Sequence, residues 1–284
     1  MIGFINIYKP SNVTSNYVVQ RLKKQFHIKK IGHMGTLDPL ASGLLPIAVG
    51  KATRLFDYML EKVKRYNVTY EFGYETDTLD STGQIVSKSK IVPTDSEIIS
   101  AIKTMIGKQE QIPPKFSAKN INGSRAYDLA RKGIDFELSP KEIEIFEIEL
   151  LNKNNNAFDF TILCSSGTYI RAIGRDLAYK LGTFATMTRL ERSQTGCFAL
   201  SNSINLDDAL KYDNIEDILI SPLDVFTNYN KKIIDSKQYK DLVDGKIIKY
   251  EYTPNNNFLI YNDKLIGISK GGKDYLKLDT YLEE

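Results

Sequence analysis

The sequence has few of the residues that form metal sites and disulfide frameworks, and it has no long apolar run. Its 284 residues include two cysteines, two histidines and no tryptophan. Cys164 and Cys197 are too few for a disulfide framework, and with so few donors we expect no metal site. No apolar run reaches the ~18–20 residues that a bilayer-spanning helix needs, and the first residues lack the basic segment of a signal peptide. We therefore expect a cytoplasmic globular protein with no membrane contact.

Acidic and basic residues nearly balance, with a net charge of +3, but they are unevenly distributed. Residues 1–133 have 20 Lys and Arg against 11 Asp and Glu, a net charge of +9. Residues 134–284 have 18 against 24, a net charge of −6. A basic half favours a polyanion as partner, although solvated basic helix faces would give the same count. The charge therefore indicates nucleic acid without indicating any chemistry.

Hydrophobic periodicity predicts strands and helices in a large first unit. Strands are expected over residues 3–8, 44–49, 66–72, 141–151 and 157–164. Helices are expected over 51–60, 124–132 and 168–181, with another that begins at a Ser15 cap. Residues 31–43 show neither period and predict a loop. Two local signals are sharper: a capping box at residues 94–97 and a hairpin turn at residues 154–156.

Residues 232–284 differ in pattern from those before them. Short apolar stretches alternate there with Asn, Asp and Gly turns, which is typical of a small β-rich domain. We therefore divide the chain into a domain of residues 1–231 and a C-terminal domain of residues 232–284. Strands and helices with hairpins between them favour an α+β fold over a doubly wound parallel one.

Asp38 is the first candidate for chemistry. Residues 43–53 do not match a Walker phosphate loop, and residues 164–167 do not match a nucleophile elbow. Asp38 lies on a glycine-rich loop beside His33, where a carboxylate can act as nucleophile or base. The alternative is an Asx-turn aspartate that only organises the loop. Arg171, at a strand-to-helix junction, either pairs with Asp38 and holds it ionised or is an ordinary surface arginine.

Residues 32–45, Gly-His-Met-Gly-Thr-Leu-Asp-Pro-Leu-Ala-Ser-Gly-Leu-Leu, closely resemble the catalytic loop of the TruB family of bacterial tRNA pseudouridine synthases. Further blocks resemble the family in the family's order, at residues 9–15, 64–66, 76–83, 111–118 and 164–171. The resemblance spans roughly residues 3–200. It departs at Asn12, where the family usually has Gly, and in the C-terminal domain, which takes the place of the family's RNA-binding PUA domain.

The resemblance implies a pseudouridine synthase fold, with a mixed, largely antiparallel sheet, a central cleft and a PUA-like C-terminal domain. It also implies an isomerase that converts the T-loop uridine of tRNA, position 55, to pseudouridine. The N-glycosidic bond breaks, uracil rotates, and C5 bonds to C1′. Because no atoms are gained or lost, neither a cofactor nor a metal is implied. The expected partner is the T arm and T loop of tRNA, with no obligate protein partner, and we expect a monomer.

The same resemblance implies roles for individual residues. Asp38 is the essential carboxylate, Arg171 its partner, and Tyr66 the aromatic residue that stacks on the flipped base. Whether Asp38 adds to C6, attacks C1′ or removes the 2′ proton stays open. The other implied site residues are His33, which fills the gap in the RNA loop, Tyr169 and Leu190, which line the uracil pocket, Lys9, which supports the site, and Asp80 and Arg54, candidates for supporting or RNA contacts. Taken alone, Tyr66 and Leu190 would be core residues and His33 a structural hydrogen-bonding residue.

Two other classes of function deserve comparison. A non-catalytic RNA-binding or tRNA-folding protein would use the basic half and the base pocket, but it needs no carboxylate beside an anionic ligand. A nucleoside hydrolase would release uracil, and it must activate water, for which glycoside hydrolases usually use a second carboxylate. Because the sequence retains Asp38, Tyr66 and Arg171, the isomerase is the prediction.

Overall fold

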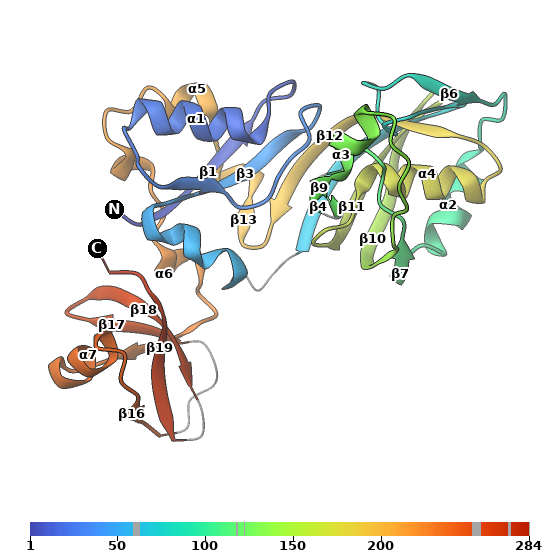
Figure 1. The fold of residues 1–284 in the computed structure, drawn as a ribbon. Helices are drawn as coiled ribbons and strands as arrows, with labels where there is room; N and C mark the ends of the chain where they lie inside the picture. Colours follow the sequence, from blue (N-terminus) through green and yellow to red (C-terminus); the bar gives the residue numbers. More distant parts are fainter. Residues whose placement is uncertain (59–62, 118, 122, 252–256, 272–273, 284) are drawn as a thin grey trace.

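A mixed sheet of ten strands forms the frame of the protein (Figure 1). The computed structural model describes residues 1–284 except 59–62, 118, 122, 252–256, 272–273 and 284. Eight strands follow one another across the sheet in the order β14-β1-β3-β12-β4-β11-β10-β7, with β2 paired to β3 and β13 to β12. The strands are β1 (Gly3–Lys9), β2 (Ile31–His33), β3 (Ser42–Val49), β4 (Val63–Phe72), β7 (Gly107–Gln111), β10 (Lys141–Asn154), β11 (Ala157–Ser165), β12 (Ala185–Thr195), β13 (Phe198–Ala199) and β14 (Ile204–Asn205).

Most pairs in this sheet are antiparallel, and the parallel ones are β1 with β14 and β3 with β12. The predicted α+β class, with a mixed and largely antiparallel sheet, is confirmed. The β3–β12 contact is short, because only Ser42 and Gly43 pair with Glu191 and Arg192. This contact joins the two halves of the sheet, which lie in different lobes in Figure 1.

Helices cover the sheet and bury its apolar residues in one large core. α4 packs on β12 and β4, and α2 packs on β10. The helices are α1 (Ser15–Gln25), α2 (Asp95–Lys103), α3 (Ala126–Arg131), α4 (Ile170–Lys180), α5 (Leu206–Ala209), α6 (Pro222–Val225) and α7 (Ser236–Val243), with 3₁₀ helices η1 (Gly50–Tyr58), η2 (Leu200–Asn202) and η3 (Ile215–Ile218). Two small hairpins pair β5 (Tyr74–Thr76) with β6 (Ile85–Lys88) and β8 (Asn120–Ile121) with β9 (Ser124–Arg125). Among the described residues, no helix is both long and apolar enough to cross a membrane.

The prediction that Ser15 caps the first helix is wrong, because Thr14 is the cap. The Thr14 hydroxyl accepts a hydrogen bond from Tyr17 N, whereas Ser15 is already helical. The Ser15 side chain is buried and bonds to the backbone of Leu37 instead. Thr14 and Ser15 both have hydroxyls that can cap a helix, so the sequence alone does not show which one is the cap. The hydrogen bond between Ser15 and Leu37, 22 residues away, leaves this role to Thr14.

Other local predictions had mixed outcomes. The capping box of Thr94 and Glu97 and the hairpin between β10 and β11 are confirmed. The loop prediction for residues 31–43 missed β2, whose partner β3 supplies the hydrogen bonds that the short segment cannot supply itself. The helix predicted over 51–60 is the 3₁₀ helix η1, and residues 59 and 60 lie outside the described residues.

A second sheet of five strands forms the C-terminal unit, as the predicted β-rich domain requires. Its order is β15-β17-β18-β19-β16, from β15 (Asn230–Ile233), β16 (Ile248–Lys249), β17 (Asn257–Tyr261), β18 (Lys264–Gly271) and β19 (Tyr275–Tyr281). β15 crosses the division placed between residues 231 and 232, which stays a prediction. An aromatic cluster that includes Phe4, Phe226 and Phe258 packs this unit against the first sheet.

Candidate active site

The loop that carries Asp38 joins β2 to β3 and is held by residues outside it. We call residues 34–41 the Asp38 loop. Leu37 N donates to Ser15 Oγ at 2.9 Å, and Asn12 N donates to Pro39 O at 2.7 Å. Asn12 has a φ of 65°, a left-handed conformation that Asn tolerates better than most residues. The start of α1 and the turn before it therefore fix the backbone on both sides of Asp38.

Lys9 is buried under the same loop. Its ammonium donates to the carbonyl oxygens of Pro10 (2.9 Å), Val13 (2.7 Å) and Pro39 (3.4 Å). Burial lowers its pKa to about 8, although the nearby Asp38 carboxylate acts in the opposite direction. The side chain is 0% exposed and is not among the residues lining the cavities around Asp38. The structure thus places Lys9 as a support of the loop and away from a substrate surface.

Arg171 lies at the centre of a polar network around Asp38. Its Nη2 is 3.0 Å from Asp38 Oδ2, and its Nη1 is 3.4 Å from Asp80 Oδ2. The same two nitrogens donate to Thr78 O at 2.9 Å and Phe116 O at 3.1 Å. Because the guanidinium is nearly buried and has partners on several segments, it is fixed in one orientation. The pairing expected of Arg171 and Asp38 is present in the structure.

Asp80 belongs to a tight loop between β5 and β6. Its Oδ1 accepts hydrogen bonds from the Thr78 hydroxyl, the Thr82 hydroxyl and Thr82 N. Ser81 N and Leu79 O bond to Met187 on β12, which attaches the loop to the main sheet. Gly83 closes the loop where a side chain would collide with Asp77 and Thr78. Asp80 is therefore a buried structural acid that also holds Arg171.

Two cavities meet at Asp38. The inner one has a volume of about 250 Å³ and contains every predicted uracil-pocket residue. Its walls are formed by Thr36, Leu37, Asp38, Lys64, Tyr66, Ser117, Gly167, Thr168, Tyr169, Ile170, Arg171 and Leu190. Tyr66 and Leu190 are 7% and 6% exposed, so they form a buried inner wall, while the exposed Thr36 and the partly exposed Asp38 lie at its open side.

The outer cavity, of about 440 Å³, shares Asp38 and Arg171 with the inner one. His33 lines it together with residues from α1, the Asp80 loop and α3, among them Thr14, Asn16, Tyr127 and Arg131. The His33 Nδ1 is buried and has no hydrogen-bond partner among the described residues. Burial and the nearby Arg192 lower the pKa of His33, so its imidazole is neutral at physiological pH.

The structure adds two basic residues that the sequence analysis did not single out. Arg192 is 0% exposed and donates to Leu44 O at 2.8 Å and to Gly35 O at 3.1 Å, across the base of the Asp38 loop. Lys64 lines the inner cavity. Burial, and then the charge of Arg192, lower the pKa of Lys64 to about 8. Residues two apart in a strand lie on the same face of the sheet. Lys64 and Arg192 could therefore have been predicted to lie on the same faces as Tyr66 and Leu190.

Tyr66 lies opposite Arg192 in the β4–β12 pairing. Burial raises the pKa of Tyr66 to about 12, while the Arg192 guanidinium opposes that rise. The phenol is therefore neutral and serves as a wall and a hydrogen-bonding group.

Tyr169 is fixed by Gln111, the first residue of a block that resembles the family but a residue to which the resemblance gave no role. Tyr169 N donates to Gln111 Oε1 at 2.8 Å, and Gln111 Nε2 donates to Tyr169 O at 3.2 Å. Tyr169 is the N-cap of α4 and has no side-chain cap of its own. The predicted helix start at residue 168 is therefore two residues early, because this clamp holds Tyr169 extended.

Arg54 is not brought to the site. Its Nη1 donates to Tyr281 O on β19 at 3.1 Å, so it contacts the C-terminal unit, and it lines neither cavity around Asp38. Across the part of the chain that the structure describes, no cluster of three or more His, Cys, Asp or Glu side chains is arranged to hold a metal.

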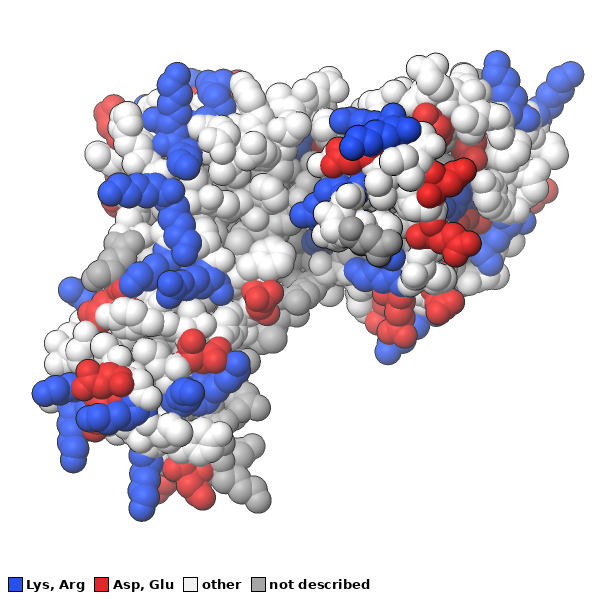
Figure 2. All heavy atoms as spheres, in the orientation of Figure 1, with Lys and Arg blue, Asp and Glu red and all other residues white. Residues whose placement is uncertain are grey.

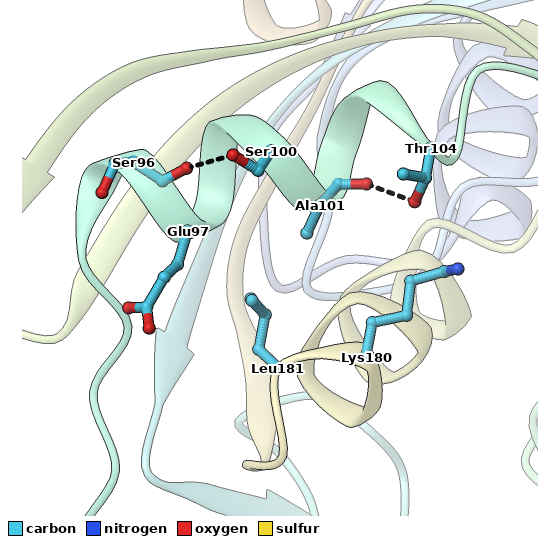
Figure 3. A pocket seen from close by; sticks show the side chains of 7 residues that line it. All are labelled: Ser96, Glu97, Ser100, Ala101, Thr104, Lys180 and Leu181. Carbon is cyan, nitrogen blue, oxygen red and sulfur yellow. Dashed lines mark hydrogen bonds between the residues drawn. The ribbon is translucent and has the colours of Figure 1, made fainter.

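A third hollow, of about 570 Å³, lies between α2 and the end of α4 (Figure 3). Its polar groups are directed to their own helix: Ser100 Oγ donates to Ser96 O and Thr104 Oγ1 donates to Ala101 O, both at 2.8 Å. Glu97 is used in the capping box. This hollow is larger than the inner cavity, but its hydroxyl groups do not converge on a point where a ligand would bind. It is therefore not a candidate active site.

The chemistry open to the Asp38 site follows from its parts. One half-exposed carboxylate faces the inner cavity and is held by a buried guanidinium. An aromatic ring and an aliphatic side chain provide flat apolar walls for a base. The neighbouring Asp80 carboxylate is nearly buried and occupied by its own loop, so it is not placed to activate water.

Comparison with known proteins identifies the family of the chain. Residues 23–170 match the family model described as TruB family pseudouridylate synthase (N terminal domain). The chain is 39% identical over 287 residues to tRNA pseudouridine synthase B of Clostridium tetani, with 98% of each chain covered. It is 46% identical over 209 residues to the protein of the same name from Ehrlichia ruminantium, covering 73% of this chain and 71% of that one.

Solved structures show the same fold. A chain of an H/ACA RNP bound to a substrate RNA containing 2′-deoxyuridine matches with a TM-score of 0.73 at 20% identity, covering 99% of this chain and 85% of that one. A chain of a Cbf5-Nop10-Gar1 complex matches with a TM-score of 0.73 at 23% identity, covering 99% and 84%. The predicted pseudouridine synthase fold with a β-rich C-terminal unit is thereby confirmed.

Proposed function

The chain belongs to the TruB family of pseudouridylate synthases, and we propose that it isomerises the T-loop uridine of tRNA, position 55, to pseudouridine. The observation that carries the proposal is the placement of Asp38. Its carboxylate lies 3.0 Å from Arg171 and borders a cavity of about 250 Å³ walled by Tyr66, Tyr169 and Leu190. A uridine flipped out of an RNA loop would place its base in this cavity and its sugar against Asp38.

The remaining residues have supporting roles in this proposal. Tyr66 stacks on the base and replaces part of the stacking lost on flipping, which is worth ~1–3 kcal/mol. Arg171 keeps Asp38 ionised and oriented, and Asp80 holds Arg171. Lys9 positions the Asp38 loop from below. His33, in the outer cavity, lies where the rest of the RNA loop would enter.

The basic surface supports tRNA as the substrate. Figure 2 shows a band of Lys and Arg side chains over the lobe that carries α1 and η1. The exposed residues of α1 and the turn after it include Lys23, Lys24, Lys29 and Lys30. A phosphate backbone along this band would be attracted without sequence preference, and the base pocket would supply selectivity. We propose a cytoplasmic enzyme that acts as a monomer on the T arm of tRNA.

The test is to treat unmodified tRNA with the protein and map pseudouridine by carbodiimide labelling and mass spectrometry. We expect label at position 55 with no change in RNA mass, and Asp38→Asn should abolish the label while leaving tRNA affinity within about threefold. Asp77→Asn, an exposed aspartate of the nearby loop, is the matched control and should turn over normally. An abasic product would indicate a hydrolase, and binding without label would indicate a binding protein. Either outcome would overturn the proposal.

A further inference from the structure

Lys64 is a cation without a counter-ion in the wall of the base pocket. It lies on β4, two residues before Tyr66, and both side chains line the inner cavity. Among the described residues, its ammonium has no hydrogen bond and no ion pair. Lys64 is partly buried, and a partly buried ammonium without a counter-ion is better explained by a ligand that supplies the missing charge.

A second cationic side chain, that of Arg192, points to the same place. The Arg192 guanidinium uses two nitrogens on Leu44 O and Gly35 O and also interacts with the Tyr66 phenol, while its buried Nη1 makes no hydrogen bond of good geometry among the described residues. A Cβ added at Gly35 would lie 3.6 Å from Lys64 Nζ and 3.7 Å from Arg192 Nη1. Two cationic donors therefore converge beneath the Asp38 loop, where Gly35 has a φ of 128° and no side chain.

The groups around Lys64 leave this positive charge uncompensated. Cys164 on β11 lies opposite Lys64 on β4. Burial raises the pKa of Cys164 to about 11, so the thiol is neutral. Tyr66 on the same strand is neutral too, and Lys141 on β10 adds positive charge. Asp38 is already paired with Arg171. The pocket is thus arranged to receive negative charge from its occupant.

We propose that Lys64 is a catalytic residue whose ammonium stabilises the negative charge on uracil after the N-glycosidic bond has broken, with Arg192 reinforcing it. The inference rests on the proposed function. When the N1–C1′ bond breaks, its electron pair stays on uracil and the charge spreads from N1 over the carbonyl oxygens. Lys64 faces this charge and transfers no proton. When C5 then bonds to C1′, the C5 proton is lost and N1 gains a proton, so that the atoms balance. Preorganised donors of this kind act most strongly where water is excluded.

The experiment compares Lys64→Met and Lys64→Arg in single-turnover release of tritium from a T-arm hairpin labelled at C5 of the target uridine. Lys64→Met should lower the maximal rate about 10²–10³-fold, the loss typical for one such donor, with hairpin affinity within about threefold of wild type. Lys64→Arg, which keeps the charge, should recover most of the rate. Lys108→Met, an exposed lysine of β7, is the matched control and should leave both quantities unchanged.

The pH profile separates a catalytic from a structural role. The wild-type rate should fall as pH rises through about 8, where Lys64 loses its charge. Lys64→Arg should move that fall to higher pH, even though Lys9, Cys164 and Tyr66 are unaltered. Lys64→Met should be at least as stable as wild type, because a partly buried charge without a counter-ion has been removed. Equal stability in urea unfolding then shows that a slow rate does not come from misfolding.

Failure of the inference is distinguishable from failure of the proposed function. If wild type releases tritium and Asp38→Asn does not, while Lys64→Met reacts at the wild-type rate, Lys64 is not catalytic and the function stands. An alkaline fall that stays in place in Lys64→Arg also rejects the inference. If wild type releases no tritium from the hairpin or from full tRNA, the proposed function itself is wrong.

Discussion

Asp38 and Asp80 are held by one guanidinium and differ in exposure. Arg171 reaches Asp38 at 3.0 Å and Asp80 at 3.4 Å, while the two acidic side chains are 36% and 7% exposed. Asp80 Oδ1 accepts hydrogen bonds from Thr78 and Thr82 of its own loop, whereas Asp38 lines the inner cavity. The same pairing thus gives one carboxylate a structural role and leaves the other accessible to a ligand.

Asp80→Ala should destabilise the protein more than loss of an ordinary surface acid. It leaves Arg171 with one fewer counter-ion and removes the acceptor of the Thr82 hydroxyl and of Thr82 N, while the Thr78 hydroxyl keeps its bond to the backbone oxygen of residue 80. Unfolding should therefore become easier by about 3–5 kcal/mol. Urea denaturation measures this. Asp77→Ala, which loses a single bond to Gln84 N in the same loop, should cost about 1 kcal/mol. Equal costs for the two variants would show that Asp80 does not anchor the network.

Tyr66→Phe and Tyr66→Leu should separate the ring from the hydroxyl. Phe keeps the stacking surface, so hairpin affinity should stay near wild type, while Leu should weaken it by ~1–3 kcal/mol. Fluorescence titration with a T-arm hairpin gives both values. Phe72→Leu, a fully buried change on the same strand, should lower stability but leave affinity unchanged. Should Tyr66→Leu bind as well as wild type, Tyr66 would be a core residue and not a base-stacking one.

The affinity for tRNA should decrease with added salt, because each neutralised phosphate releases counterions. Lys29→Gln and Lys30→Gln should each reduce the slope of log Kd against log salt by about 1 if the lysine contacts a phosphate. Lys211, whose charge is paired with Asp208 at 2.7 Å, is the control and should leave the slope unchanged on substitution by Gln. A flat salt series for the wild type would contradict an electrostatic docking surface.

Stability should increase with pH just above neutrality. Burial lowers the pKa of Lys9 and of Lys64 from 10.5 to about 8, so above pH 8 the unfolded chain binds more protons than the folded one. The free energy of unfolding should therefore rise by about 2 kcal/mol between pH 7.5 and 9. Above pH 9 the rise should lessen, because burial raises the pKa of Cys164 from 9.0 to about 11. The folded thiol then keeps a proton that the unfolded chain loses, so this group lowers the free energy of unfolding as pH rises. Urea unfolding at several pH values checks this, and Lys64→Met should remove roughly half of the rise. A profile without a rise would show that these lysines are solvated.

Gly43→Ala should disrupt the junction between β3 and β12. A Cβ there would lie 2.4 Å from the backbone oxygen of Arg192 in a conformation with φ of 100°. Gly107 has a nearly identical φ of 107° but nothing within 4 Å of its Cβ position, so Gly107→Ala carries the backbone strain alone. We expect about 1–2 kcal/mol of destabilisation for Gly107→Ala and at least 2 kcal/mol more for Gly43→Ala, measured by thermal unfolding. Similar losses would mean that the junction relaxes without cost.

Sequence reasoning recovered the parts of the fold that are set locally. The capping box at Thr94 and the hairpin after Asn154 depend on neighbours within a few residues, and both were predictable. The cap at Thr14 was not, because Ser15 is diverted by Leu37 on a distant segment. β2 was missed for a similar reason, since its three residues form a strand only beside β3.

The candidate site divides in the same way. Motif resemblance identified Asp38, Tyr66 and Arg171, which the structure brings together. It gave no role to Gln111, although residue 111 begins one of the blocks that resemble the family. It also missed Arg192, whose burial depends on the crossing of β12 beneath the Asp38 loop. The period of two along β4 and β12 pointed to Lys64 and Arg192, but alternation alone does not show which face lines a pocket.

Most of the hydrogen bonds and ion pairs that hold the Asp38 loop come from residues outside the loop. Residues 9–15, Arg171 on α4 and Arg192 on β12 supply the bonds that shape it, so three other segments of the chain hold the loop. Residues 34–41 transplanted into another scaffold would therefore carry the aspartate without its geometry. Residues 9–15, α4 and β12 would have to be transplanted with them.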